Sequence, residues 1–302
     1  MIKSLALAAL LVAPLFSQTP YERALVRADS AYRLGEYQTA IAIVNSAIAL
    51  DSAGAAAHKL KGEILLRVGD ASAAIDCFDK LVALEPKDPE ALRLRGEAFY
   101  QYGILDRALE DARAAVAYDP TSIESYRLAA KTSRALHDYF AAVDYIEEAL
   151  TYDSSNTALY FDRAELYADV GWYARAAEDL RAALEIEPDA PETVIALSAA
   201  LATAGKIDSA YVLLNELVEA RPDYARAFLA RARLLYELGS FREAIEDCGA
   251  ALNVDPNFVD AYLLRAYSNI SLGMNDRACP DIERAVELGS REAEVARDLY
   301  CR

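Results

Sequence analysis

Few side chains in this sequence have the types and spacing that catalysis or metal binding requires. There are two histidines, His58 and His137, far apart along the chain, and four cysteines without a Cys-x-x-Cys pair. The sequence contains no His-Glu-x-x-His motif, Gly-rich phosphate loop or nucleophile elbow. A serine nucleophile would lack an evident histidine base. These absences argue against an enzyme and predict no cofactor and no metal site, although a site assembled from distant residues stays open.

A strict internal repeat is the strongest signal in the sequence. Starting at Tyr21, eight frames of 34 residues follow one another to Glu292 without insertion or deletion. In every frame an alanine stands at position 20, and in seven of the eight a glycine stands at position 15; the fourth frame has His137 there. The glycines are Gly35, Gly69, Gly103, Gly171, Gly205, Gly239 and Gly273. Such a period predicts a stack of supersecondary units.

Each frame reads as two amphipathic helices around its glycine. In the third frame, apolar residues recur at helical spacing over 91–102 and 105–118, with Gly103 between these stretches and Pro120 after them. Glycine favours the left-handed turn that ends the first helix, and proline ends the second. Small residues at frame positions 8 and 20 would let the two helices approach closely. Each frame is therefore predicted to fold as a helical hairpin.

This pattern resembles the tetratricopeptide repeat family, with its small–Gly–aromatic–Ala–Pro signature. The segments GWYARA (171–176) and GSFREA (239–244) match that signature closely. The resemblance implies an all-α, right-handed superhelical α-solenoid of eight helix-turn-helix repeats over 21–289, whose first helices line a concave groove. It further implies a scaffold that binds a protein or peptide.

The first residues of the chain differ from the repeats. Lys3 is followed by an almost wholly apolar run from Ser4 to Phe16 and then by Ser17. This order predicts a secretory signal peptide over 1–17, a short segment over 18–20 and a periplasmic or secreted protein. An uncleaved anchor and a buried first helix are the alternatives. The run is shorter than the roughly 20 residues that span a bilayer, and no later segment qualifies as a membrane span.

The net charge of −17 bears on the choice of partner. An acidic surface repels phosphate backbones, so nucleic acid is not an expected partner. The charge is dispersed along the chain, which favours solubility more than one particular function.

Arginine and aspartate recur together at two frame positions. Position 7 is arginine in five frames, and position 23 is aspartate in four of them; the exception is the first frame, with Arg27 and Ile43. Frames with Ala129 or Leu197 at position 7 have Tyr145 or Leu213 at position 23. The four pairs are Arg95 and Asp111, Arg163 and Asp179, Arg231 and Asp247, and Arg265 and Asp281. Antiparallel helices would bring the two positions together. We therefore predict ion pairs within these hairpins rather than arginines waiting for a ligand.

A capping helix and a disulfide are expected at the C-terminal end. Residues 291–300 should form a short helix, N-capped by Ser290, that covers the apolar face of the eighth hairpin within the segment 290–302. Cys279 precedes the turn at Gly289 by ten residues and Cys301 follows it by twelve, so antiparallel helices would bring them level. In an oxidising compartment the two would form a disulfide that adds about 3 kcal/mol. Pro280 could remove a hydrogen bond or shift the start of its helix.

The resemblance also suggests a binding groove, because frame positions 2, 5, 9 and 12 face the concave side in that family. Position 5 changes from basic in three frames to apolar in the next four. The predicted basic part comprises Lys59, Arg93, Arg127, Lys131 and Arg134. The predicted apolar part comprises Phe161, Ile195, Leu229, Tyr236, Leu263 and Tyr267. Such a bipartite groove would bind an acidic segment and apolar side chains of one peptide.

Two alternatives compete with this interpretation. Glu63, Glu90, Glu97 and Glu124 could neutralise the basic residues as solvated ion pairs. The protein could also bind carbohydrate or another small ligand, in which case a closed concavity with convergent polar groups is expected. His58 falls at a packing position and His137 in a turn, so neither is a favoured ligand.

Overall fold

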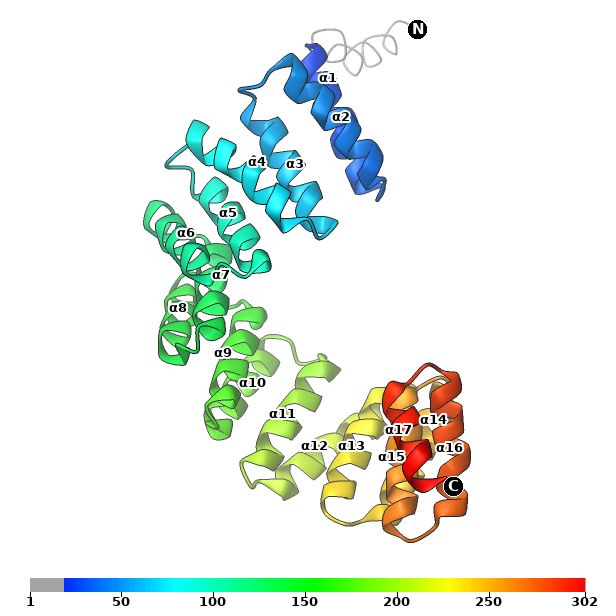
Figure 1. Cartoon of the computed structure of the whole chain (residues 1–302). Coiled ribbons are helices and arrows are strands. Elements are labelled where there is room, and N and C mark those ends of the chain that lie inside the picture. The colour runs from blue at the N-terminus through cyan, green and yellow to red at the C-terminus, as the bar shows by residue number, and fades with distance from the viewer. Residues whose placement is uncertain (1–18, 302) are drawn as a thin grey trace, which may run out of the picture. The chain divides into compact units, whose positions relative to one another are not determined.

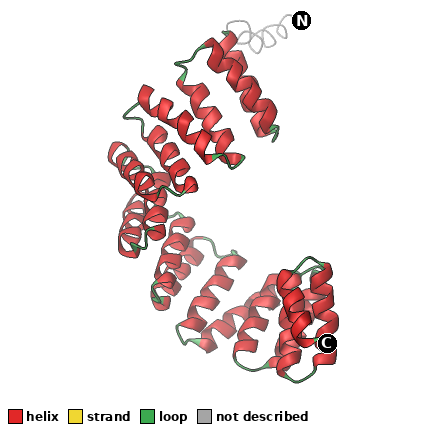
Figure 2. Cartoon of the chain, viewed as in Figure 1, coloured by secondary structure: helices red, strands yellow, loops and turns green. Residues whose placement is uncertain are grey.

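The computed structural model describes residues 19–301, and all of its regular structure in this range is helical (Figures 1 and 2). The predicted leader, residues 1–17, lies outside the described residues. The chain divides into two compact units, unit 1 (Met1–Ser154) and unit 2 (Ser155–Arg302). No helix among residues 19–301 is long and apolar enough to cross a membrane.

Seventeen helices make up the described part of the chain, two in each frame and one at the end. Unit 1 contains α1 (Pro20–Arg33), α2 (Tyr37–Leu50), α3 (Ala55–Arg67), α4 (Ala71–Leu84), α5 (Pro89–Tyr102), α6 (Leu105–Tyr118), α7 (Ile123–Ala135) and α8 (Tyr139–Tyr152). Unit 2 contains α9 (Thr157–Asp169), α10 (Tyr173–Ile186), α11 (Pro191–Thr203), α12 (Ile207–Ala220), α13 (Ala225–Glu237), α14 (Phe241–Val254), α15 (Val259–Ser271), α16 (Asn275–Glu287) and α17 (Arg291–Tyr300). The predicted α-solenoid of helical hairpins is confirmed.

The turn inside each hairpin is set by one left-handed residue. Gly35 has φ +78°, its N–H donates to the carbonyl of Tyr32, and the N–H of Glu36 donates to that of Ala31. These two hydrogen bonds satisfy backbone carbonyls of the last turn of α1, which have no partner within the helix. His137 adopts the same conformation, with φ +63°, although it has a side chain. The fourth hairpin therefore keeps its turn at the expense of backbone strain.

Close helix approach depends on small residues at frame position 8. A Cβ added to Gly62 would lie 2.5 Å from the ring of Phe78 on α4. A Cβ added to Gly96 would lie 3.2 Å from the backbone oxygen of Ala108 on α6. Glycine at this position thus makes room for the Phe78 ring in the second repeat and for the backbone of α6 in the third. The alanines at position 20 are buried in all eight hairpins.

The first helices of successive repeats also touch one another. In unit 1, α3 contacts α1 and α5, and α5 contacts α7. In unit 2, α13 contacts α11 and α15. Exposed residues of these helices therefore form continuous surfaces within each unit, and these surfaces hold the candidate binding residues except Phe161, which lies on α9.

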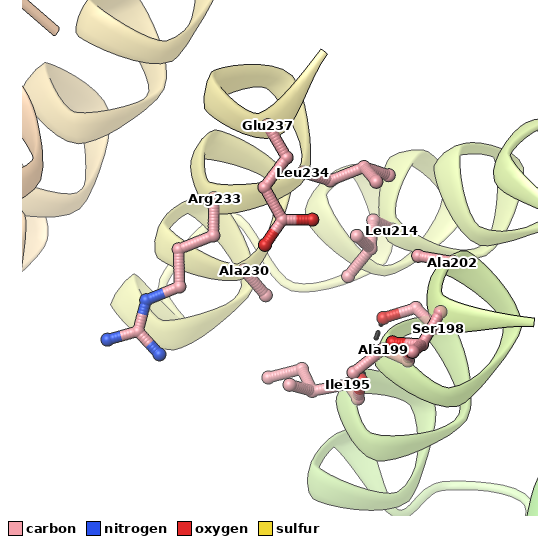
Figure 3. Close-up of a pocket in the computed structure, with 10 residues that line it drawn as sticks. Ile195, Ser198, Ala199, Ala202, Leu214, Ala230, Arg233, Leu234 and Glu237 are labelled. Carbon is pink, nitrogen blue, oxygen red and sulfur yellow. Dashed lines mark hydrogen bonds between the residues drawn. The ribbon is translucent and has the colours of Figure 1, made fainter. Parts of the chain in front are cut away.

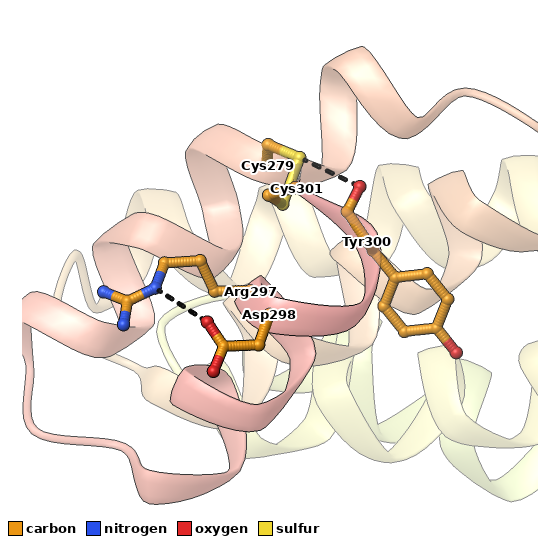
Figure 4. Close-up of a disulfide and its surroundings, with 5 residues drawn as sticks. All are labelled: Cys279, Arg297, Asp298, Tyr300 and Cys301. Atoms are coloured by element: carbon orange, nitrogen blue, oxygen red, sulfur yellow. Dashed lines mark hydrogen bonds and ion pairs between the residues drawn. A yellow bond between two sulfur atoms is a disulfide. The ribbon is translucent and has the colours of Figure 1, made fainter.

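The C-terminal end of the chain matches the prediction. Helix α17 buries Ala293 and Ala296 against Ile282 and Ala285 of α16, and the Ser290 hydroxyl caps its N-terminus. Cys279 and Cys301 form a disulfide, with Cα atoms 5.5 Å apart (Figure 4). Helix α16 begins at the same frame position as the other second helices and continues through Pro280, so the proline does not shift its start.

Candidate protein-binding surfaces

The four predicted Arg–Asp pairs join the two helices of their hairpins. Each is bidentate: in the third repeat, Arg95 donates through Nε and Nη2 to the carboxylate of Asp111 at 2.8 Å. The aspartates are 5–7% exposed. The equivalent distances in the other three pairs are 2.6–2.9 Å. These arginines are committed to the scaffold and are not available for a ligand.

Two of these arginines also link neighbouring repeats. Nη1 of Arg95 donates to Asp79 of the preceding hairpin at 3.0 Å, and Nη1 of Arg231 donates to Asn215 at 2.6 Å. In the fourth repeat, where position 7 is alanine, Arg113 of the third repeat donates to the hydroxyl of Tyr145 at 2.8 Å. The arginine that bonds to position 23 of the fourth repeat therefore comes from the repeat before it.

The basic residues of unit 1 lie on the surfaces of α3, α5 and α7. Two are paired with glutamates of neighbouring first helices: Lys59 Nζ lies 2.6 Å from Glu90 Oε2, and Lys131 Nζ lies 3.3 Å from Glu97 Oε1. Lys131 also lies over the ring of Tyr100, 4.1 Å from its centre. The alternative of neutralisation by glutamates thus holds for these two lysines.

Arg93 differs from these two lysines. It is half-buried and, within the described residues, has no hydrogen bond or ion pair. Arg127 is exposed and Arg134 is half-buried, and both have partners. The surface of unit 1 therefore has a guanidinium at Arg93 that no carboxylate of residues 19–301 contacts directly, with the paired Lys59 and Lys131 on the neighbouring helices.

Glu63 on α3 lies beside the basic residues of this surface and is half-buried. Burial raises the pKa of Glu63 above its ordinary value of 4.5, against the opposing charges of Lys59 and Arg93. Desolvation thus outweighs the attraction of the two cations.

Two residues of the predicted apolar surface of unit 2 do not lie on a surface. Leu229 is 5% exposed and packs with Leu252 and Ala261, while Leu263 is 6% exposed and packs with Ile282 and Ala293. The prediction was wrong for Leu229 and Leu263, because both side chains pack against helices that follow them in the chain. A long lysine or arginine at the same position carries its charge out to solvent.

The other four predicted residues of unit 2 are half-buried. Tyr236 lies edge-on to Phe241, with ring centres 5.3 Å apart. The hydroxyl of Tyr267 donates to Glu292 of α17 at 2.9 Å, and burial together with that carboxylate raises the pKa of Tyr267 to about 12. Both tyrosines are thus engaged with neighbouring helices. Phe161 and Ile195 keep part of their apolar surface accessible.

A pocket of about 180 Å³ opens between α11 and α13 beside Ile195 (Figure 3). Leu214 and Leu234 lie at its base, 2% and 6% exposed, and exposed residues form its mouth. Its lining residues are Ile195, Ser198, Ala199, Ala202, Thr203, Leu214, Ala230, Arg233, Leu234 and Glu237. Sequence reasoning did not find it. The available signal was the pair of small residues, Ala199 and Ala202, at positions 9 and 12 of the sixth frame.

Family comparisons follow the repeat pattern. Models described as tetratricopeptide repeat match residues 25–82, 60–123, 229–293 and 168–234. The chain belongs to the tetratricopeptide repeat family. No protein of curated function matches the sequence.

Solved structures of tetratricopeptide repeat proteins share the fold. A tetratricopeptide repeat protein from Parabacteroides merdae is similar over 80% of this chain and 94% of its own, with 20% identity and a TM-score of 0.60. The C-terminal part of a TPR repeat-containing protein from Cytophaga hutchinsonii is similar over 78% of this chain and 97% of its own, with 15% identity and a TM-score of 0.63. These likenesses concern the fold.

The remaining reactive side chains have packing roles in this repeat fold. His58 is 2% exposed, and its Nε2 lies 2.9 Å from the carbonyl oxygen of Ser52. Cys77 and Cys248 are buried free thiols, and burial raises the pKa of Cys248 to about 12, which makes it a poor nucleophile. No cluster suited to a metal ion occurs among residues 19–301. Tetratricopeptide repeats are generally non-catalytic.

Proposed function

We propose that this protein is a non-catalytic scaffold that binds a protein or peptide through the surfaces of its first helices. The observation that carries the proposal is Arg93 on α5, which no described carboxylate contacts directly. The residues at the same frame position on the adjacent helices, Lys59 and Arg127, are also basic. A segment of the partner that contains carboxylates is the ligand this surface fits best.

The two ion pairs at this surface do not prevent such binding. The side chains of Lys59 and Glu90 are 34% and 51% exposed, and those of Lys131 and Glu97 are 47% and 27% exposed. Exposed pairs of this kind contribute at most about 1 kcal/mol. A partner carboxylate that forms charge-assisted hydrogen bonds with Arg93 can compete for the lysines as well.

Unit 2 supplies apolar contacts in this proposal, through Phe161 and Ile195. Its pocket, about 180 Å³, is smaller than the roughly 300–1,000 Å³ typical of small-molecule sites. The pocket thus suits a side chain of a protein partner better than a whole carbohydrate or other small ligand.

Export belongs to the same proposal. The order of Lys3, an apolar run and Ser17 is typical of a signal peptide, and a disulfide between Cys279 and Cys301 persists in an oxidising compartment. The mature protein is then periplasmic or secreted. Intact-mass measurement of the protein from its native source should give a chain beginning at Gln18, with two free thiols fewer after oxidation than after reduction.

Site-specific cross-linking tests the binding surface. A photo-reactive phenylalanine analogue placed at Arg93 or Arg127 should cross-link one partner in the native extracellular or envelope fraction. The same analogue at Asp106, exposed on the second helix α6, serves as the control. Cross-linking from Asp106 alone would place the binding surface on the second helices.

Binding to the identified partner then separates the two units. Charge reversal at Arg93 and Arg127 should weaken binding most at low salt, because screening reduces electrostatic attraction. Phe161→Ala and Ile195→Ala should weaken binding at any salt concentration. Unchanged affinity in all four variants would exclude these surfaces.

A further inference from the structure

The pocket between α11 and α13 has a defined chemical character. Ser198 Oγ donates to the carbonyl of Ile195 at 2.8 Å, and Thr203 Oγ1 donates to that of Ala199 at 2.9 Å (Figure 3). Both hydroxyl protons are thus used within α11. The remaining lining of α11 and the base of the pocket are apolar. The walls consequently favour an aliphatic group over a sugar or a carboxylate.

The two charged residues at the mouth are not equivalent. Nη2 of Arg233 lies 2.9 Å from Asp260 Oδ2, so the one cation of the lining is already paired. Glu237, one turn further along α13, has no hydrogen bond or ion pair within residues 19–301. Figure 3 shows its carboxylate turned toward the hollow. The mouth therefore offers a negative charge without a counter-ion beside an apolar cavity.

The size of the cavity restricts what can enter. An engineered apolar cavity of about 150 Å³ holds a benzene molecule, and this pocket measures about 180 Å³. It has room for one leucine-sized side chain. The space exists because α11 has Ala202 at frame position 12, where the third and seventh repeats have Tyr100 and Tyr236.

We infer that this pocket binds an aliphatic side chain of the partner, with an adjacent lysine or arginine of the same segment paired to Glu237. The inference rests on the proposed function, because it names the kind of segment that unit 2 recognises. It also differs from the recognition by unit 1, where the surface is basic and the fitting segment is acidic.

Short peptides test the pocket without the natural partner. The probes are acetylated and amidated Gly-Leu-Lys-Gly, Gly-Leu-Glu-Gly and Gly-Ala-Lys-Gly, titrated into protein with ¹³C-labelled alanine methyl groups. The methyl groups of Ala199, Ala202 and Ala230 report directly on the cavity. The Leu-Lys peptide should shift the resonances of these methyl groups saturably. The Leu-Glu peptide should bind about fivefold more weakly, because one exposed ion pair contributes about that much to affinity. The Ala-Lys peptide should give no saturable shift.

Two variants and one control complete the experiment. Ala202→Tyr introduces a residue that the third and seventh repeats accommodate at the same position, so it should fold while abolishing the shifts at Ala199 and Ala230. Glu237→Lys should reverse the preference between the Leu-Lys and Leu-Glu peptides. Glu243→Lys, on α14 outside the pocket, makes the same change in net charge and should leave that preference intact.

The outcomes separate this inference from the proposed function. If the Leu-Lys peptide shifts none of the three methyl groups, or if Ala202→Tyr and Glu237→Lys bind like the unmodified protein, the pocket is not a side-chain site. A scaffold that binds only through unit 1 would fail this test and still cross-link from Arg93. A pocket that binds the peptides in a protein with no cross-linked partner would support the inference and contradict the wider proposal.

Discussion

The first-helix surfaces of the two units differ in chemistry, although the hairpins beneath them are built alike. In unit 1, frame position 5 is apolar only in the first repeat, at Leu25; the other three repeats carry Lys59, Arg93 and Arg127, whose charged groups reach solvent or neighbouring carboxylates. In unit 2 the same position carries apolar residues, and two of these, Leu229 and Leu263, are buried. Position 5 is thus a surface position in three repeats of unit 1 and partly a core position in unit 2.

The constant part of the hairpins explains how this difference is tolerated. Alanine at position 20, a small residue at position 8 and a left-handed residue at position 15 recur in both units. These positions hold the two helices together, so position 5 can change without loss of the fold. Some positions of the repeat therefore determine stability, whereas others are available for recognition. Position 5 has the first role in some repeats and the second role in others.

The largest expected effect comes from truncating position 5 in unit 2. Leu229→Ala should lower the free energy of unfolding by about 2 to 3 kcal/mol, since it removes a buried side chain and leaves a cavity. Arg93→Ala, at the same frame position in unit 1, should change it by less than about 0.5 kcal/mol. Urea unfolding of both variants measures the contrast. Equal losses would mean that position 5 has one role throughout the array.

A somewhat smaller loss is expected from breaking one Arg–Asp pair. Asp247→Ala leaves the Arg231 guanidinium, whose side chain is only 19% exposed, with Asn215 as its remaining partner. Asp247→Ala should lower the free energy of unfolding by about 2 kcal/mol, which is less than the loss expected when a fully buried ion pair is broken. Replacing both Arg231 and Asp247 by leucine copies the sixth repeat, which has Leu197 and Leu213, and should recover most of that loss. No recovery would show that the pair itself is required.

The sequence predicted the hairpins, the ion pairs and the disulfide because each follows from the spacing of residues on two consecutive antiparallel helices. Arg231 and Asp247, for example, are related by the geometry of one hairpin. The burial of Leu229 depends instead on Ala261 of the next repeat. The pocket beside Ala202 depends on the small side chains of Ala199 and Ala202 on α11 and of Ala230 on α13. Such properties belong to the packing between repeats, which the pattern within one frame does not determine.

The fourth repeat allows a smaller test of the constant positions. His137 has φ +63°, a conformation that costs a residue with a side chain about 1–2 kcal/mol. His137→Gly should raise the free energy of unfolding by about 0.5 kcal/mol, because the greater freedom of glycine in the unfolded chain offsets part of the relief. Amide hydrogen exchange in α7 and α8 measures the local change. Gly103→Ala, at the same frame position in the third repeat, should lower the free energy of unfolding.

The smallest effect concerns Glu63 on the basic surface of unit 1. Its pKa is raised by burial above 4.5, so the folded protein binds the proton more tightly than the unfolded chain. Stability should then fall as the pH rises from about 4.5 through the raised pKa. Glu63→Gln should be more stable than the unmodified protein at pH 7.5, and this advantage should vanish below pH 4.

Glu97→Gln, at the same frame position in the third repeat, is the matched control for Glu63→Gln. It removes the partner of Lys131 and should not stabilise the protein at either pH. Urea midpoints of the three proteins at pH 7.5 and pH 4.0 measure the differences. If Glu63→Gln proves less stable at pH 7.5, Lys59 and Arg93 already stabilise that carboxylate fully. The basic surface would then be neutralised from within, and its proposed preference for an acidic partner would lose its physical basis.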